Sequence, residues 1–132
     1  MKKILSLFAI FSIAVLLNFV FANSVESIKP VDAQKMQQEK KAIIVDVREA
    51  DEIKEGMVKG ASIAPLSTMK EKKDEWEKIV STLPKDKTIV VYCRSGHRAG
   101  IVGEELQKKG FHVLNMGGFE SWQKAGLPVE KK

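Results

Sequence analysis

A single cysteine followed at once by arginines is the part of this sequence with the clearest capacity for chemistry. Cys93 is the only cysteine among 132 residues, and after it come Arg94, Ser95, Gly96, His97 and Arg98. A polar loop that contains glycine and leads into a helix can direct backbone N–H groups and the positive end of the helix dipole toward an anion. Neighbouring arginines add positive charge and favour a thiolate over a thiol. We therefore expect Cys93 to be a nucleophile.

The elements that would position this cysteine follow from the pattern of apolar residues. Short β-branched runs at 43–45, 89–92 and 113–114 predict strands, and weaker strands are expected near residues 28 and 63. Helical spacing predicts helices over 32–38, 49–55, 76–83, 98–109 and 119–125, with Trp76 and Trp122 in the core. This alternation predicts an α/β fold, with a parallel sheet of about five strands and helices on both faces. Cys93 would then lie at the carboxyl end of a strand, where open parallel sheets bind ligands.

The N-terminal segment differs from the rest of the chain. Lys2 and Lys3 precede a nearly uninterrupted apolar run over 4–21, and no acidic residue occurs before Glu26. This pattern predicts a signal peptide over residues 1–22 and a domain over 23–132, in the periplasm or secreted. An uncleaved anchor is the alternative, because an 18-residue apolar run approaches the roughly 20 residues that span a bilayer. The apolar run ends in Val-Phe-Ala and is followed by Asn23 and Ser24, which favours cleavage after residue 22. After cleavage we expect no membrane contact.

Composition narrows the remaining possibilities. The chain is 44% hydrophobic and 30% charged without repeats, which is typical of a globular domain. Without Lys2 and Lys3, 20 basic residues face 17 acidic ones, and mixed runs such as 71–75 indicate a solvated helix face rather than a nucleic-acid-binding surface. The two histidines are too few for a metal site, so we expect neither metal nor cofactor. The remaining 110 residues leave room for one domain, expected to be a monomer.

An unpaired cysteine outside the cytoplasm has three interpretations. It can form an intermolecular disulfide, serve as an inert buried side chain, or act as a reactive centre. The arginines and the glycine beside Cys93 favour the reactive centre. His97 is not needed as a general base there, because a thiolate is already a nucleophile, and His112 is expected to be structural.

Three segments resemble the motifs of the rhodanese (sulfurtransferase) family. The sequence Cys-Arg-Ser-Gly-His-Arg at 93–98 resembles its active-site loop. Upstream, 45–49, Glu52 and 56–61 resemble the first signature; downstream, 116–119, Trp122 and 125–129 resemble the closing one. The motifs occur in the family's order over about 28–129, which implies a single rhodanese-like three-layer domain. Met57 and Ala99 depart from the pattern, where histidine and a hydroxyl residue are common, and leave rate and substrate preference open.

The resemblance implies a persulfide cycle with small-molecule partners. The Cys93 thiolate would attack the outer sulfur of thiosulfate or a related donor, and the bound sulfur would pass to an acceptor such as cyanide or a thiol. Backbone N–H groups from Arg94 to Arg98 would hold the outer sulfur, and the Arg94 side chain would receive the sulfonate. Arg98 would pair with Asp46 or Glu52. The loop-supporting residues expected are Asp46, Arg48 and Glu52, the first two as a framework ion pair or a loop brace.

Two other functions stay open. A cysteine phosphatase or arsenate reductase also places a thiolate and an arginine in a loop after a strand. Such phosphatases have five residues between the two, whereas four separate Cys93 from Arg98, which makes a smaller cradle and favours sulfur transfer. A carrier that accepts a persulfide without rapid turnover would have the same loop.

Overall fold

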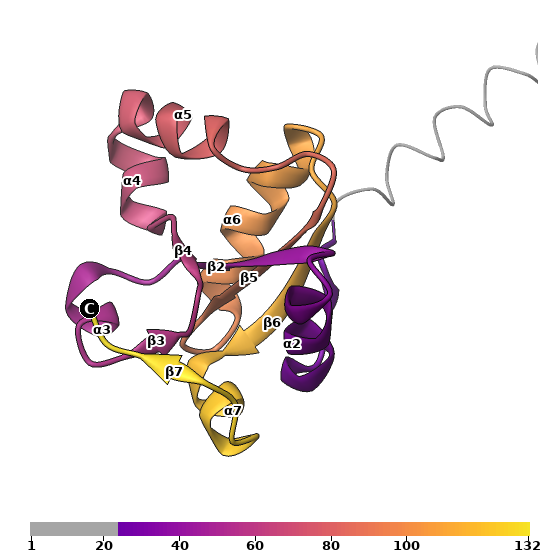
Figure 1. Cartoon of the computed structure of the whole chain (residues 1–132). Coiled ribbons are helices and arrows are strands. Elements are labelled where there is room, and N and C mark those ends of the chain that lie inside the picture. Colours follow the sequence, from indigo (N-terminus) through magenta and orange to yellow (C-terminus); the bar gives the residue numbers. More distant parts are fainter. Residues whose placement is uncertain (1–23) are drawn as a thin grey trace, which may run out of the picture.

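The computed structural model describes residues 24–132, so the signal peptide predicted over residues 1–22 lies outside the described residues. At the centre is a sheet with the strand order β1 (Glu26–Ser27), β6 (Val113–Gly118), β5 (Thr88–Cys93), β2 (Ala42–Asp46) and β4 (Ser62–Ile63). Each neighbouring pair is parallel, which confirms the predicted parallel five-stranded sheet (Figure 1). Within residues 24–132, no helix is both long enough and apolar enough to cross a bilayer.

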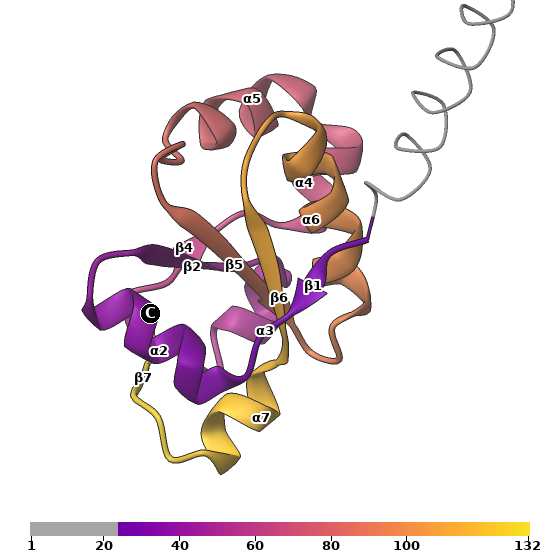
Figure 2. The same cartoon turned by 90° about the vertical axis from the view of Figure 1, so that its right-hand side faces the viewer.

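Helices cover both faces of the sheet, as predicted. On one face lie α4 (Leu66–Glu71), α5 (Lys73–Ser81) and α6 (His97–Lys108), and on the other lie α2 (Pro30–Gln38), α3 (Ala50–Ile53) and α7 (Phe119–Lys124). Figure 2 shows the sheet between α6 on one side and α2 and α7 on the other. The result is a three-layer α/β domain.

The central strand β5 supplies side chains to both halves of the core. Ile89, Val91 and Cys93 belong to the cluster under α5 and α6, whereas Val90 and Tyr92 belong to the cluster under α2 and α7. This alternation is the period-two pattern of a strand, and burial on both faces explains why β5 is apolar throughout. Trp76 and Trp122 are both buried, one in each cluster, as the sequence predicted.

Three short elements were not predicted from the sequence. One is α4, and the other two are β3 (Met57–Val58) and β7 (Val129–Glu130), which pair antiparallel with each other. Strands of two residues carry no readable periodicity, and their pairing joins the C-terminal end of the chain to a segment more than seventy residues earlier. The fully buried Met57 and Val58 take part in the core under α7 rather than in the active-site loop.

Candidate active site

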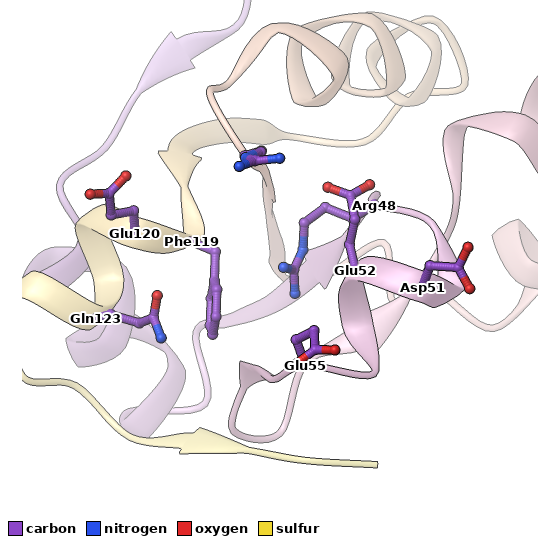
Figure 3. A pocket seen from close by; sticks show the side chains of 8 residues that line it. Arg48, Asp51, Glu52, Glu55, Phe119, Glu120 and Gln123 are labelled. Atoms are coloured by element: carbon purple, nitrogen blue, oxygen red, sulfur yellow. The ribbon is translucent and has the colours of Figure 1, made fainter.

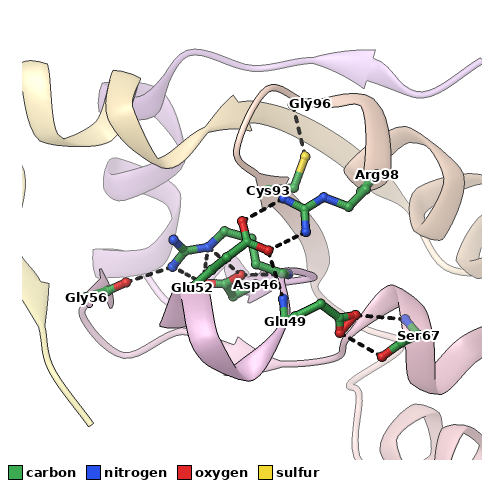
Figure 4. Close-up of polar contacts among 9 residues, drawn as sticks. Asp46, Glu49, Glu52, Gly56, Ser67, Cys93, Gly96 and Arg98 are labelled. Carbon is green, nitrogen blue, oxygen red and sulfur yellow. Dashed lines mark hydrogen bonds and ion pairs between the residues drawn. The ribbon is translucent and has the colours of Figure 1, made fainter. Parts of the chain in front are cut away.

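Cys93 is the last residue of β5, and its thiol lies in the turn that begins α6. The residue has no solvent exposure, and its Sγ accepts a hydrogen bond from the backbone N–H of Gly96 at 3.0 Å (Figure 4). Gly96 precedes the first residue of α6 and has a φ of 98°, a conformation that favours glycine. The Sγ atom therefore lies near the positive end of the dipole of a twelve-residue helix.

Glycines of β6 allow this loop to approach the sheet closely. Gly118 pairs with Cys93, and a Cβ atom added to Gly118 would overlap the carbonyl oxygen of Arg94. A Cβ added to Gly96 would lie only 3.2 Å from the Cα of Gly117. The closing motif thus has a direct role at the site, because its glycines leave the space in which the loop sits.

Asn115 of β6 braces the same loop. Its Nδ2 donates to the carbonyl oxygen of Gly96 at 2.9 Å, and its Oδ1 accepts from the N–H of Gly117 at 2.8 Å. The register of β6 against β5 shifts at this point, so that Asn115 pairs with Val91 while Gly117 pairs with Tyr92. Asn115 therefore binds the carbonyl oxygen of Gly96, the same residue whose backbone N–H donates to Cys93.

Arg98 connects the loop to α3. Its Nη1 and Nη2 donate to the two oxygens of Glu52 at 2.6 and 2.8 Å, so Glu52 is its partner among the two expected (Figure 4). The hydrogen bond from Arg98 holds the pKa of Glu52 at about 2, below its ordinary 4.5, and the same bond raises the pKa of Arg98. Glu52 also accepts from the backbone N–H of Glu49, where it closes the first turn of α3. One carboxylate thus fixes both the helix and the arginine.

Asp46 and Arg48 form a separate, buried network. Arg48 donates three side-chain hydrogen bonds to the carboxylate of Asp46, from Nη2 at 2.7 Å and from Nε at 3.0 and 3.1 Å. Arg48 also donates to the carbonyl oxygen of Gly56, and the Tyr92 hydroxyl donates to Asp46. Burial raises the pKa of Tyr92, and the neighbouring Asp46 raises it further. These contacts make the pair part of the framework between β2, β5 and β3, and none of them reaches the Cys93 loop.

A cavity of about 640 Å³ opens beside the loop. Its lining comes from α3, α7 and the loop, and comprises Arg48, Asp51, Glu52, Glu55, Arg94, Phe119, Glu120 and Gln123. Figure 3 shows Phe119 on one side of Arg48 and Glu52 on the other, and the guanidinium carbon lies 4.5 Å from the Phe119 ring centroid. Arg94 is exposed and is the one member of the 93–98 loop in this lining, while Ser95 and His97 are exposed outside it. The cavity offers room for a small substrate beside the loop that follows Cys93.

Several residues of the site escaped the sequence analysis. Asn115 was not predicted, although a polar residue inside the apolar strand 113–116 is a signal that could have marked it. Phe119 was noted only as part of the closing motif and of the last predicted helix, without a role at the site. Tyr92 was read only as part of a strand, because its hydrogen bonds reach Asp46 and Val58, which are distant in the sequence. Within the described part of the chain, no group of three or more His, Cys, Asp or Glu side chains is arranged to hold a metal ion.

Comparison with known proteins gives a consistent family. The model of the rhodanese-like domain matches residues 29–125. A sulfurtransferase from Allochromatium vinosum is 32% identical over 74% of this chain and 86% of its own length, and the thiosulfate sulfurtransferase PspE of Escherichia coli K12 is 35% identical over 58% and 69%. The solved polysulfide-sulfur transferase homodimer of Wolinella succinogenes is 29% identical, with a TM-score of 0.66 over 82% of this chain and 80% of that one.

The fold and site define a class of protein: an α/β domain with a cysteine at the carboxyl end of a central parallel strand, just before the loop that leads into a helix. Within that class, the chain belongs to the rhodanese-like domain family, which confirms the resemblance seen in the sequence. The named relatives support sulfur transfer as its general activity.

Proposed function

We propose that this protein is a thiosulfate sulfurtransferase that carries sulfur as a persulfide on Cys93. The observation that carries the proposal is the Gly96 N–H at 3.0 Å from Sγ, at the start of α6. A hydrogen bond from the backbone and the helix dipole both stabilise negative charge on that sulfur. The same groups are available to the persulfide that replaces the thiolate.

In the first half-reaction, the Cys93 thiolate attacks the outer sulfur of thiosulfate. A bond forms between Sγ and that sulfur, the bond between the two thiosulfate sulfurs breaks, and sulfite leaves with the electron pair. Arg94, exposed at the cavity, is the group we assign to the sulfonate end. Neither half-reaction needs a proton-transfer residue, which fits the exposed position of His97 outside the cavity lining.

In the second half-reaction, a nucleophilic acceptor attacks the outer sulfur of the persulfide. Cys93 leaves as the thiolate and is ready for another cycle. N–H groups of the loop from Arg94 to Arg98, with that of Gly96 as the anchor, would hold the transferring sulfur, and Arg98 acts by fixing the loop to Glu52.

The engagement of Arg98 favours sulfur transfer over phosphate chemistry. Both of its terminal nitrogens donate to Glu52, so its positive charge is already paired with a carboxylate and is less available to a phosphate. A polysulfide donor is a second candidate, because the relative from Wolinella succinogenes is named a polysulfide-sulfur transferase. We further propose export of the domain as a monomer that needs no cofactor, as residues 1–22 and the composition suggest.

The test is thiocyanate formation from thiosulfate and cyanide, with wild type beside Cys93→Ser. We expect turnover by wild type and a loss of at least about a thousandfold in the variant, because a hydroxyl is not ionised at neutral pH. Mass spectrometry after treatment with thiosulfate should show one added sulfur atom on wild type alone. Turnover of a phosphate ester with none of thiosulfate would contradict the proposal, and sulfur loading without turnover would make the protein a carrier.

A further inference from the structure

The cavity that adjoins the Cys93 loop at Arg94 carries more carboxylates than guanidinium groups. Its lining contains four carboxylates and two guanidinium groups, namely those of Asp51, Glu52, Glu55, Glu120, Arg48 and Arg94. A small thiol whose only charged group is a carboxylate is an anion, so an excess of negative charge at the entrance works against it as a sulfur acceptor. The distribution of this charge decides how strong that effect is.

Ion pairing neutralises the inner part of the lining. Glu52 is bound by both terminal nitrogens of Arg98, and Arg48 is held by the buried Asp46. Glu120 pairs with Lys124 at 3.1 Å, but both side chains are about three-quarters exposed, so this pair is weak. Arg94 is therefore the one cation of the lining without a carboxylate partner among residues 24–132.

Two carboxylates on α3 and the turn after it remain uncompensated. Asp51 and Glu55 form no ion pair within residues 24–132, and both are exposed at the cavity. Figure 3 shows them on the side of the cavity opposite Phe119 and Gln123 of α7. A reactant that enters between these walls passes an apolar aromatic surface on one side and negative charge on the other.

We propose that this cavity selects the sulfur acceptor by charge and that its acceptor class is a small thiol with a positively charged group near the sulfur. The inference rests on the proposed function, since it names the acceptor of the second half-reaction. The acceptor thiolate attacks the outer sulfur of the protonated Cys93 persulfide, a new S–S bond forms, and the bond to Sγ breaks. Cys93 leaves as the thiolate and the acceptor becomes a persulfide, with no net oxidation or reduction.

The experiment compares three acceptors of similar size and different charge. Wild-type protein is loaded with thiosulfate, freed from excess donor, and discharged in a single turnover by 2-aminoethanethiol, 2-mercaptoethanol or mercaptoacetate, which carry a cationic, a neutral and an anionic group. The same rates are measured for the double variant Asp51→Asn, Glu55→Gln. A matched control, Asp74→Asn, Glu75→Gln, removes two exposed carboxylates from α5, at the far end of the molecule from α7 (Figure 1).

The quantity that tests the proposal is the ratio of the cationic to the anionic rate, because differences in intrinsic thiol reactivity cancel between proteins. We expect this ratio to fall by about fivefold in the cavity variant, as exposed charge interactions are individually weak, and to stay unchanged in the α5 control. The neutral thiol should be nearly unaffected. High salt should reduce the wild-type ratio toward that of the cavity variant.

Alkylation of Cys93 gives a readout that does not depend on sulfur transfer. Iodoacetamide is neutral and iodoacetate is an anion. The ratio of the iodoacetamide rate to the iodoacetate rate should therefore fall in the cavity variant and stay unchanged in the control. If all three proteins show the same ratios, the inference is overturned and the proposed function stands. If wild type accepts sulfur but no thiol discharges it, the acceptor assignment alone is overturned. If wild type accepts no sulfur, the proposed function fails, and the acceptor assignment fails with it.

Discussion

Two arginine–carboxylate pairs lie within the same part of the molecule and differ in what they hold together. Arg48 and Asp46 are buried, and their contacts join β2, Gly56 and Tyr92. Arg98 and Glu52 keep about a quarter of each side chain exposed, and they join the Cys93 loop to α3. The first pair is a framework that the fold requires, whereas the second positions the reacting loop. Changing one partner of the buried pair should therefore mainly lower stability, whereas changing one partner of the second pair should mainly lower activity.

The largest effect is expected at the buried pair. Asp46→Asn removes the charge that Arg48 faces and weakens the acceptor for the Tyr92 hydroxyl. Breaking a buried pair by changing one partner leaves an uncompensated charge, at a cost of about 3 to 5 kcal/mol. Urea unfolding at pH 7 measures this loss. A destabilisation smaller than that of Glu52→Gln would reverse our ranking of the two pairs.

A smaller loss of stability but a clearer loss of activity is expected for Glu52→Gln. We expect the free energy of unfolding to fall by about 1 to 2 kcal/mol at pH 7, because the pKa of Glu52 is lowered to about 2 but the pair is partly exposed. Sulfur transfer should fall about tenfold, because Arg98 no longer fixes the loop. Glu55→Gln, which changes the net charge equally, serves as the control in unfolding experiments.

The contribution of Glu52 to stability should also depend on pH in a defined direction. Its pKa in the folded protein lies below the ordinary 4.5, so the stabilisation is complete above that pH and is lost as the pH falls through about 2. The difference between wild type and Glu52→Gln should therefore shrink from pH 5 to pH 2. A difference that stays constant over this range would mean that the ion pair is not its source.

Asn115 tests the loop from the opposite side. Asn115→Ala removes the hydrogen bonds to Gly96 and Gly117, so the Gly96 N–H should be less well aimed at Sγ. We expect alkylation of Cys93 by iodoacetamide at pH 7 to slow about threefold to tenfold, with a loss of stability of about 1 kcal/mol. An unchanged alkylation rate in the folded variant would limit Asn115 to a structural role.

The smallest effect is expected at His97. Its side chain is exposed, and it forms no side-chain hydrogen bond within the described residues. His97→Ala should change kcat/KM for thiosulfate by less than about twofold, because a thiolate nucleophile needs no base. A loss beyond about tenfold would instead make His97 a catalytic residue.

Much of the fold was readable because its signals are local. The apolar run of β5 and the helical spacing in α5 and α6 extend over consecutive residues, so the sequence predicted both their type and their order. The short strands β3 and β7 and the shortened helix α3 were missed or misjudged because their limits depend on partners elsewhere. The same reason left the partner of Arg98 open between Asp46 and Glu52.

The sequence by itself identified the family and predicted Cys93 as the nucleophile, because both depend on contiguous residue types such as those at 93–98. Only the tertiary structure decided that Glu52 holds Arg98 and that Asp51 and Glu55 face the cavity. It also decided that Asn115 braces the loop and that Gly118, which has no side chain, leaves room for it. The physical reason is that hydrogen bonds and charge effects act over a few ångströms in space. Residues that are far apart along the chain reach that range only after the sheet has formed.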